Sequence, residues 1–177
     1  MINVATIFTR VGLVEQRYCI WINRISENHL VRAFFVLISR LGDGILWYSL
    51  IATLPLLQGK EGLLPVLHIL VTGIVCLSLY KFLKPRLLRE RPYISCINIK
   101  RAAPALDQYS FPSGHTMHAV TFSTCLSFYA PQLGAMVWGF TLLIATSRVV
   151  LGLHYPTDVA AGAALGYGIA SISLALI

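Results

Sequence analysis

Five long apolar stretches dominate this sequence of 177 residues. They cover approximately residues 41–58, 63–83, 114–130, 133–150 and 157–177, each close to the roughly 20 residues that a helix needs to cross a bilayer. Charged residues make up only 12% of the chain, about half of the roughly 25% found in soluble domains. We therefore predict an all-α protein, a multi-pass transmembrane helical bundle of about five spans, formed by a single membrane-embedded domain over residues 1–177.

The composition also argues against several other classes of protein. Disorder, nucleic-acid binding and a secreted disulfide scaffold all fit poorly with 56% hydrophobic residues. The four cysteines show no spacing typical of a metal site or a disulfide framework. The first 20 residues lack the continuous apolar core and the cleavage site of a signal peptide, so we expect the apolar segments themselves to direct membrane insertion.

Residues 11–30 show a different pattern from the five spans. Apolar residues recur there at near-helical spacing, with the charged residues off the stripe: Val11, Val14, Tyr18, Ile22, Ile25 and Leu30. We predict that residues 1–30 contain an amphipathic helix lying in the membrane interface. An ordinary helix packed on the bundle explains the pattern equally well.

A long polar loop over residues 84–113 separates the second span from the third. Counting the crossings places this loop, residues 151–156 and the N-terminal segment on the same side of the membrane. The unusual polar residues of the chain therefore collect at one face. We call this the predicted active face.

Three polar clusters occupy the predicted active face, and each alone has an ordinary explanation, such as an orientation signal, a helix cap or a structural histidine. Together they predict an oxyanion site. Lys84, Arg91 and Arg148 supply fixed positive charge, and arginine binds phosphate oxygens well. The free N–H groups at a helix start favour an anion, and this helix start contains Ser113, Gly114 and His115.

Two histidines divide the predicted chemistry of this site. His154 precedes Asp158 by four residues, so the carboxylate can orient one ring nitrogen while the other attacks phosphorus. His115 belongs to another cluster and is predicted to protonate the leaving oxygen as general acid. Because fixed cations can stabilise the transferring phosphoryl group, we expect neither a metal ion nor another cofactor.

The spacing of the clusters resembles the three-part signature of the type 2 phosphatidic acid phosphatases, a superfamily that includes glucose-6-phosphatase and the vanadium haloperoxidases. The matching segments are Lys84-x6-Arg91-Pro92, Pro112-Ser113-Gly114-His115 and Ser147-Arg148-x5-His154-x3-Asp158. The resemblance extends over about residues 63–177. It implies a helical bundle and metal-independent hydrolysis of a phosphomonoester or diphosphate through a phosphohistidine.

The same resemblance implies a role for each residue of the signature. His154 would be the nucleophile, Asp158 its orienting partner and His115 the general acid. Phosphate would be bound by Lys84, Arg91, Ser113, Gly114 and Arg148.

These observations lead to the hypothesis of an integral membrane lipid phosphatase, acting on undecaprenyl diphosphate, phosphatidylglycerophosphate or phosphatidic acid. A lipid A phosphatase and a non-catalytic phospholipid-binding or transport protein are the alternatives, and the apolar spans argue against a vanadate-dependent oxidase. The expected partners are a membrane lipid phosphate and the bilayer, with no nucleic acid and no obligate protein partner.

Two indications disagree about orientation in the inner (cytoplasmic) membrane, where we expect this multi-pass protein. Of the 14 Lys and Arg residues, 13 lie on the predicted active face and only Lys60 lies on the other, which predicts a cytoplasmic site. Bacterial members that process isoprenyl diphosphates or lipid A usually face outward.

Two further charged residues lie near this face. Asp43 either pairs with a basic residue of the long loop or marks the start of the first span. Arg89 is expected to face solvent or lipid headgroups, with contact to a second phosphate as the alternative.

Overall fold

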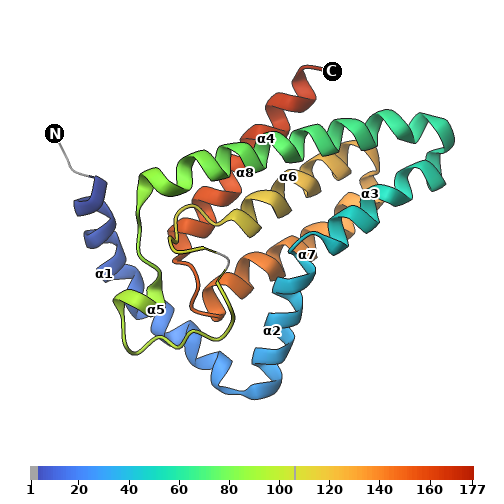
Figure 1. Ribbon diagram of the computed structural model, residues 1–177. Coiled ribbons are helices and arrows are strands. Elements are labelled where there is room, and N and C mark those ends of the chain that lie inside the picture. The colour runs from blue at the N-terminus through green and yellow to red at the C-terminus, as the bar shows by residue number, and fades with distance from the viewer. Residues whose placement is uncertain (1–3, 106) are drawn as a thin grey trace.

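A computed structural model describes residues 4–105 and 107–177, without the side chains of residues 4–7 and 9. The regular elements of these residues are all helical, so the predicted fold class is confirmed (Figure 1). In chain order they are α1 (Val4–Asn23), η1 (Arg24–Glu27), α2 (His29–Leu41), α3 (Ile45–Gln58), η2 (Gly59–Gly62), α4 (Leu63–Leu87), α5 (Pro92–Ser95), α6 (Gly114–Tyr129), α7 (Pro131–Val150) and α8 (Pro156–Ala175).

The bundle is built around α6, which packs against α4, α7 and α8 (Figure 1). Ten of the sixteen residues of α6 are buried, so this helix is the core of the protein. Close approach of α8 depends on glycine: a Cβ at Gly166 would lie 2.3 Å from the carbonyl oxygen of Met117, and one at Gly162 would lie 2.5 Å from that of Ser113. All five predicted apolar spans are helices in the structure, namely α3, α4, α6, α7 and α8.

The outer surface of the bundle is apolar, as a bilayer requires. Three segments of the described residues are long and apolar enough to cross a membrane: Ile45–Ser95, which contains the α3–α4 hairpin, Pro131–Val150 and Pro156–Ala175. Large apolar side chains point outward along them, including Leu64 at 76% and Met136 at 77% exposure. A surface of this kind is stable in lipid rather than in water. The count of five crossings stays a prediction.

The N-terminal segment differs from its prediction. In place of one helix ending near Leu30, α1 ends at Asn23 and α2 begins at His29. Asn28 causes this break, because its side-chain oxygen accepts hydrogen bonds from the N–H groups of Leu30 (2.9 Å) and Val31 (3.3 Å) and so caps a new helix.

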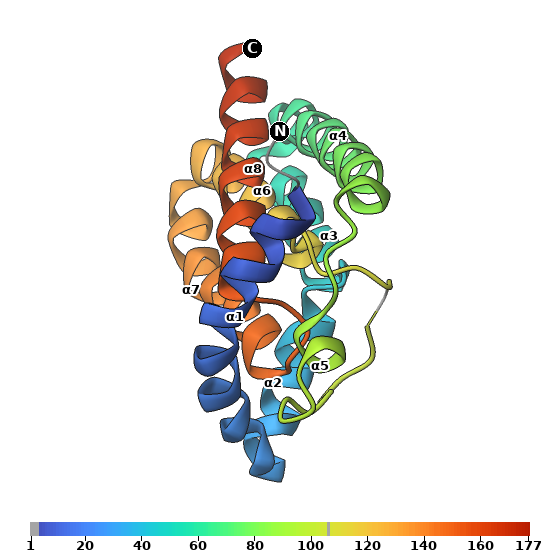
Figure 2. The ribbon, with the colours of Figure 1, turned by 90° about the vertical axis from the view of Figure 1, so that its left-hand side faces the viewer.

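The long loop also starts later than predicted. Helix α4 continues through Lys84 to Leu87, and the chain leaves it with Leu88 in a left-handed conformation (φ 40°). Arg91 is extended because a proline follows it. The ends of α4 and α7 and the starts of α6 and α8 meet at one end of the bundle, which faces the viewer in Figure 2. The N–H of Ser113 there donates to the carbonyl of Asp158 (3.0 Å), so the predicted clusters do lie together.

Candidate active site

Two of the predicted phosphate ligands, Lys84 and Arg91, converge on one carboxylate. Lys84 Nζ lies 3.0 Å and a guanidinium nitrogen of Arg91 2.7 Å from Oδ1 of Asp107, and the hydroxyl of Tyr80 donates to Oδ2. Both basic side chains are buried. Because carboxylate and phosphate oxygens accept the same charged hydrogen bonds, this is an anion-binding site held by a residue of the long loop.

The charge of Asp107 is stabilised by its surroundings. Burial raises the pKa of the Asp107 carboxyl, but the hydrogen bond from Tyr80 and the charges of Lys84 and Arg91 outweigh burial and leave the pKa below its usual value. The carboxylate is therefore ionised near neutral pH. Its role was missed from the sequence, where nothing distinguishes this aspartate from other polar residues of the loop.

His154 presents one ring nitrogen to the same cations. Its Nε2 lies 3.2 Å from a guanidinium nitrogen of Arg91. Arginine can only donate, so Nε2 accepts the bond and carries the free electron pair. Burial, together with the positive charges of Arg91, Arg148 and Lys84, lowers the pKa of His154 well below 6.5. His154 is thus neutral at physiological pH, the state in which imidazole is a nucleophile.

The structure brings His154 and Asp158 together without a hydrogen bond between them. Nδ1 of His154 lies 3.6 Å from Oδ2 of Asp158, which is too long for such a bond, and it has no other hydrogen-bond partner among the described residues. Oδ2 instead accepts from the backbone N–H of Tyr155 (2.8 Å). In proteins without bound substrate, hydrogen bonds between catalytic groups are often long in this way and tighten in the substrate complex.

The start of α6 carries the second cluster. Gly114 allows the ring of Tyr80 to approach, because a Cβ there would lie 2.6 Å from that ring. The buried hydroxyl of Ser113 lies 3.0 Å from that of Thr116 and caps no N–H group. His115 bonds through Nε2 to Asp43, which lies in the turn between α2 and α3.

Asp43 therefore pairs with a predicted catalytic histidine rather than with a basic residue of the long loop. Burial raises the pKa of the Asp43 carboxyl, but the hydrogen bond with His115 and the charges of Arg148 and Arg40 leave it below its usual value. The ionised carboxylate can fix the orientation of the His115 ring, the residue predicted to act as general acid.

Arg148 connects the third cluster to the rest of the site. Its buried side chain donates to the hydroxyl of Ser39 in α2, and its carbonyl accepts the N–H of His154 (3.1 Å). The carbonyl of Leu153, in the loop that carries His154, accepts from Arg91 (2.7 Å). These bonds hold the loop of residues 151–155, which carries His154, against both the first cluster and the N-terminal half of the chain.

The expectation that Arg89 faces solvent or headgroups is wrong. Its side chain is buried, and it donates to Oδ1 of Asp158 at 2.6 Å and to Glu15 at 2.7 Å. Burial alternates from residue to residue after α4: Leu88 and Glu90 are exposed, whereas Arg89 is buried like Arg91. Glu15 was likewise missed, since a single acidic residue on an amphipathic helix gives no sign of its partner.

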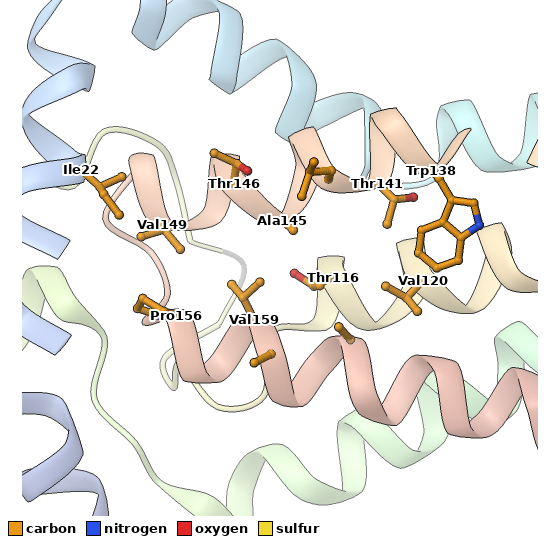
Figure 3. Close-up of a pocket in the computed structure, with 13 residues that line it drawn as sticks. Ile22, Thr116, Val120, Trp138, Thr141, Ala145, Thr146, Val149, Pro156 and Val159 are labelled. Carbon is orange, nitrogen blue, oxygen red and sulfur yellow. The ribbon is translucent and has the colours of Figure 1, made fainter. Parts of the chain in front are cut away.

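A separate apolar cavity of about 480 Å³ lies between α7 and α8 against α6 (Figure 3). Thr116 and Val120 of α6, Trp138 of α7 and Val159 of α8 line it, and none of the predicted site residues does. The lining suits hydrocarbon rather than phosphate.

Comparison with known proteins identifies the family. The model of the PAP2 superfamily matches residues 63–177, the part of the chain that carries all eight predicted site residues. The chain belongs to the PAP2 superfamily. The match covers α4 to α8, so α1, α2 and α3 of this PAP2 protein lie outside it.

Three relatives show how far the similarity extends. Phosphatidylglycerophosphatase B of Haemophilus influenzae is 44% identical over 81 residues, which are 39% of this chain and 33% of that protein. Undecaprenyl-diphosphatase of Sulfolobus acidocaldarius is 28% identical over 156 residues, or 85% of this chain and 73% of that protein. The crystal structure of Aquifex aeolicus LpxE superimposes with a TM-score of 0.67 at 28% identity, covering 88% of this chain and 93% of that chain.

Proposed function

We propose that this PAP2 protein is an integral membrane lipid phosphatase that hydrolyses a lipid phosphomonoester or diphosphate through a phosphohistidine, without a metal ion. The observation that carries the proposal is the contact between Nε2 of His154 and Arg91. A neutral imidazole with a free electron pair lies beside the buried cations Arg91 and Lys84, so a bound phosphate has its phosphorus next to a nucleophile.

The proposed reaction has two steps. The substrate phosphate replaces Asp107 on Lys84 and Arg91, and Nε2 of His154 attacks phosphorus while the bond to the leaving oxygen breaks. His115 donates a proton to that oxygen. In the second step a water molecule gives a proton to His115 and attacks the phosphohistidine, which breaks the P–N bond and releases inorganic phosphate.

A lipid substrate fits the position of this site. The site lies at the end of a bundle whose sides are apolar, so a phosphate head can reach the cations while its hydrocarbon chain stays in the bilayer. The similarity to a phosphatidylglycerophosphatase and an undecaprenyl-diphosphatase supports the same substrate class. We include phosphatidic acid and lipid A among the candidates.

Phosphate release by the purified protein in EDTA tests this function. Three proteins are assayed: wild type, His154→Ala and a control, His29→Ala, which removes an exposed histidine. Each is offered undecaprenyl diphosphate, phosphatidylglycerophosphate, phosphatidic acid and lipid A. We expect release by wild type and His29→Ala and none by His154→Ala. Binding of a lipid without release would indicate a lipid-binding or transport protein instead.

We further propose that the protein resides in the inner (cytoplasmic) membrane with its site on the cytoplasmic side. On the topology predicted from the sequence, 13 of the 14 basic residues lie on the predicted active face, whereas Lys60 lies in the turn after α3. A Lys60→Cys variant without native cysteines should react with a membrane-impermeant maleimide in intact cells. Labelling only after the cells are opened would place the site on the outer side.

A further inference from the structure

A buried chain of three charged side chains connects α1 to the catalytic centre. Arg89 lies in the middle, with one guanidinium nitrogen 2.6 Å from Oδ1 of Asp158 and the other 2.7 Å from Oε2 of Glu15. The exposed fractions of Glu15, Arg89 and Asp158 are only 7%, 4% and 0%. Buried charges of this kind are costly unless each has its partner, so the three side chains depend on one another.

Glu15 also holds the start of the helix that carries Asp158. Its Oε1 accepts the backbone N–H of Thr157 (2.7 Å), and its Oε2 accepts the Thr157 hydroxyl (2.8 Å). Arg89 donates to the same hydroxyl (2.7 Å). An ionised carboxylate at a helix N-terminus satisfies a free N–H group and interacts favourably with the helix dipole.

Polar contacts help to hold α1 against the protein. Glu15 and Asn23 face the protein, while Val14, Tyr18 and Trp21 point outward with exposures of 61–69%. Asn23 donates to the carbonyl of Val150 (2.9 Å), just before residues 151–155, the loop that carries His154. The inward face of α1 therefore joins polar contacts to the site with apolar packing around Cys19, while large apolar side chains point away from the protein.

From this geometry we infer that Glu15 and Arg89 are positioning residues of the catalytic centre, with Arg89 fixing the carboxylate of Asp158 and Glu15 fixing Arg89. The inference rests on the proposed function. Arg89 binds Oδ1, and the N–H of Tyr155 binds Oδ2, so the plane of the carboxylate is set from both ends. Oδ2 is thereby kept on the side of Nδ1 of His154, where it can orient the nucleophile.

The test uses the full chain with Glu15→Gln, Arg89→Met and Arg89→Lys. Two controls carry matched substitutions at exposed positions: Glu27→Gln, whose carboxylate pairs with Lys100 on the surface, and Arg86→Met, which lies against Phe82 on α4. For Glu15→Gln and Arg89→Met we expect kcat to fall about 10- to 100-fold, the effect typical of hydrogen-bonded partners that orient a functional group, with KM nearly unchanged. Arg89→Lys should restore part of kcat, and the controls should match wild type.

Vanadate distinguishes positioning from a general loss of structure. Vanadate bonded to the nucleophile has the geometry of the transferring phosphoryl group. Inhibition by vanadate should therefore weaken in Glu15→Gln and Arg89→Met in proportion to the fall in kcat. Inhibition by inorganic phosphate, which needs only the cations, should not change. Wild-type kcat in Glu15→Gln, or an equal weakening of vanadate and phosphate, would overturn the inference.

Binding of vanadate and phosphate tests the positioning role independently of the proposed function. If wild-type protein released no phosphate from any lipid, the proposed function would fail. Calorimetric binding of vanadate and phosphate to wild type and Glu15→Gln would then still test the positioning role: selective weakening of vanadate supports it, and identical affinities contradict it. A melting temperature measured for each variant shows whether it is folded. If Arg89→Met does not fold, Arg89→Lys takes its place in the comparison.

Discussion

The carboxylate of Asp107 lies between Lys84 and Arg91, with its Oδ1 atom 3.0 Å from the ammonium nitrogen and 2.7 Å from the guanidinium. These two cations are the ones proposed to bind the substrate phosphate. Asp107 and the substrate therefore compete for the same donors. A loop residue can in this way lower the cost of burying the two cations until a phosphate replaces it.

Asp107→Asn should bind phosphate more tightly than wild type. The amide keeps the size of the side chain but removes the charge that competes for Lys84 and Arg91. We expect KM and the inhibition constant of inorganic phosphate to fall about tenfold, which corresponds to about 1.4 kcal/mol. Glu90→Gln, an exposed position of the same loop, should leave both constants unchanged. A higher KM in Asp107→Asn would show that Asp107 orients the cations instead of competing for them.

The pH dependence of activity should respond to Lys84. The positive charge of Lys84 contributes to the lowered pKa of His154, so Lys84→Gln should raise that pKa toward 6.5. A higher pKa means that His154 becomes protonated, and is lost as a nucleophile, at a higher pH. The acid limb of kcat/KM against pH should therefore shift upward, beyond any overall loss of affinity. Lys81→Gln, an exposed change on the same helix, should leave the limb in place.

Chelation should not remove activity. In the proposed mechanism the phosphoryl charge is met by the side chains of Lys84, Arg91 and Arg148, which EDTA does not affect. We expect phosphate release at the same rate with and without EDTA and no stimulation by Mg²⁺. Loss of release in EDTA with recovery in Mg²⁺ would contradict the metal-independent mechanism.

Gly166→Ala should destabilise the contact between α6 and α8. The added Cβ would lie 2.3 Å from the carbonyl oxygen of Met117, a backbone atom that can move only if the helices separate. We expect a loss of about 1–3 kcal/mol, the usual cost of overpacking, measured as a lower melting temperature in detergent. Gly168→Ala on the same helix has nothing within 4 Å of its new Cβ and should not lower the melting temperature. Equal melting temperatures of the two variants would disprove close packing at Gly166.

Features that depend on neighbouring residues could be predicted from the sequence, whereas contacts between distant segments could not. Helices α3, α4, α6, α7 and α8 follow from uninterrupted apolar runs, because a chain in lipid has to satisfy its backbone within each segment. The break at Asn28 is also local, since a cap needs only the next few residues, yet the apolar stripe across it concealed it. His154 and Asp158 could be paired from their spacing alone, because His154 lies just before α8 and Asp158 lies in the first turn of that helix.

Local patterns along the chain thus predict the helical bundle, the clustering of polar residues at one end, and the residues proposed for the anion site with its two histidines. The folded chain, in contrast, shows which carboxylate pairs with which basic side chain: Asp107 with Lys84 and Arg91, Asp43 with His115, and Glu15 with Arg89 behind Asp158. Such pairs could not be predicted because a charge pair leaves no periodic trace along the chain. Its two members can be 74 residues apart, as Glu15 and Arg89 are, and folding alone brings them to 2.7 Å.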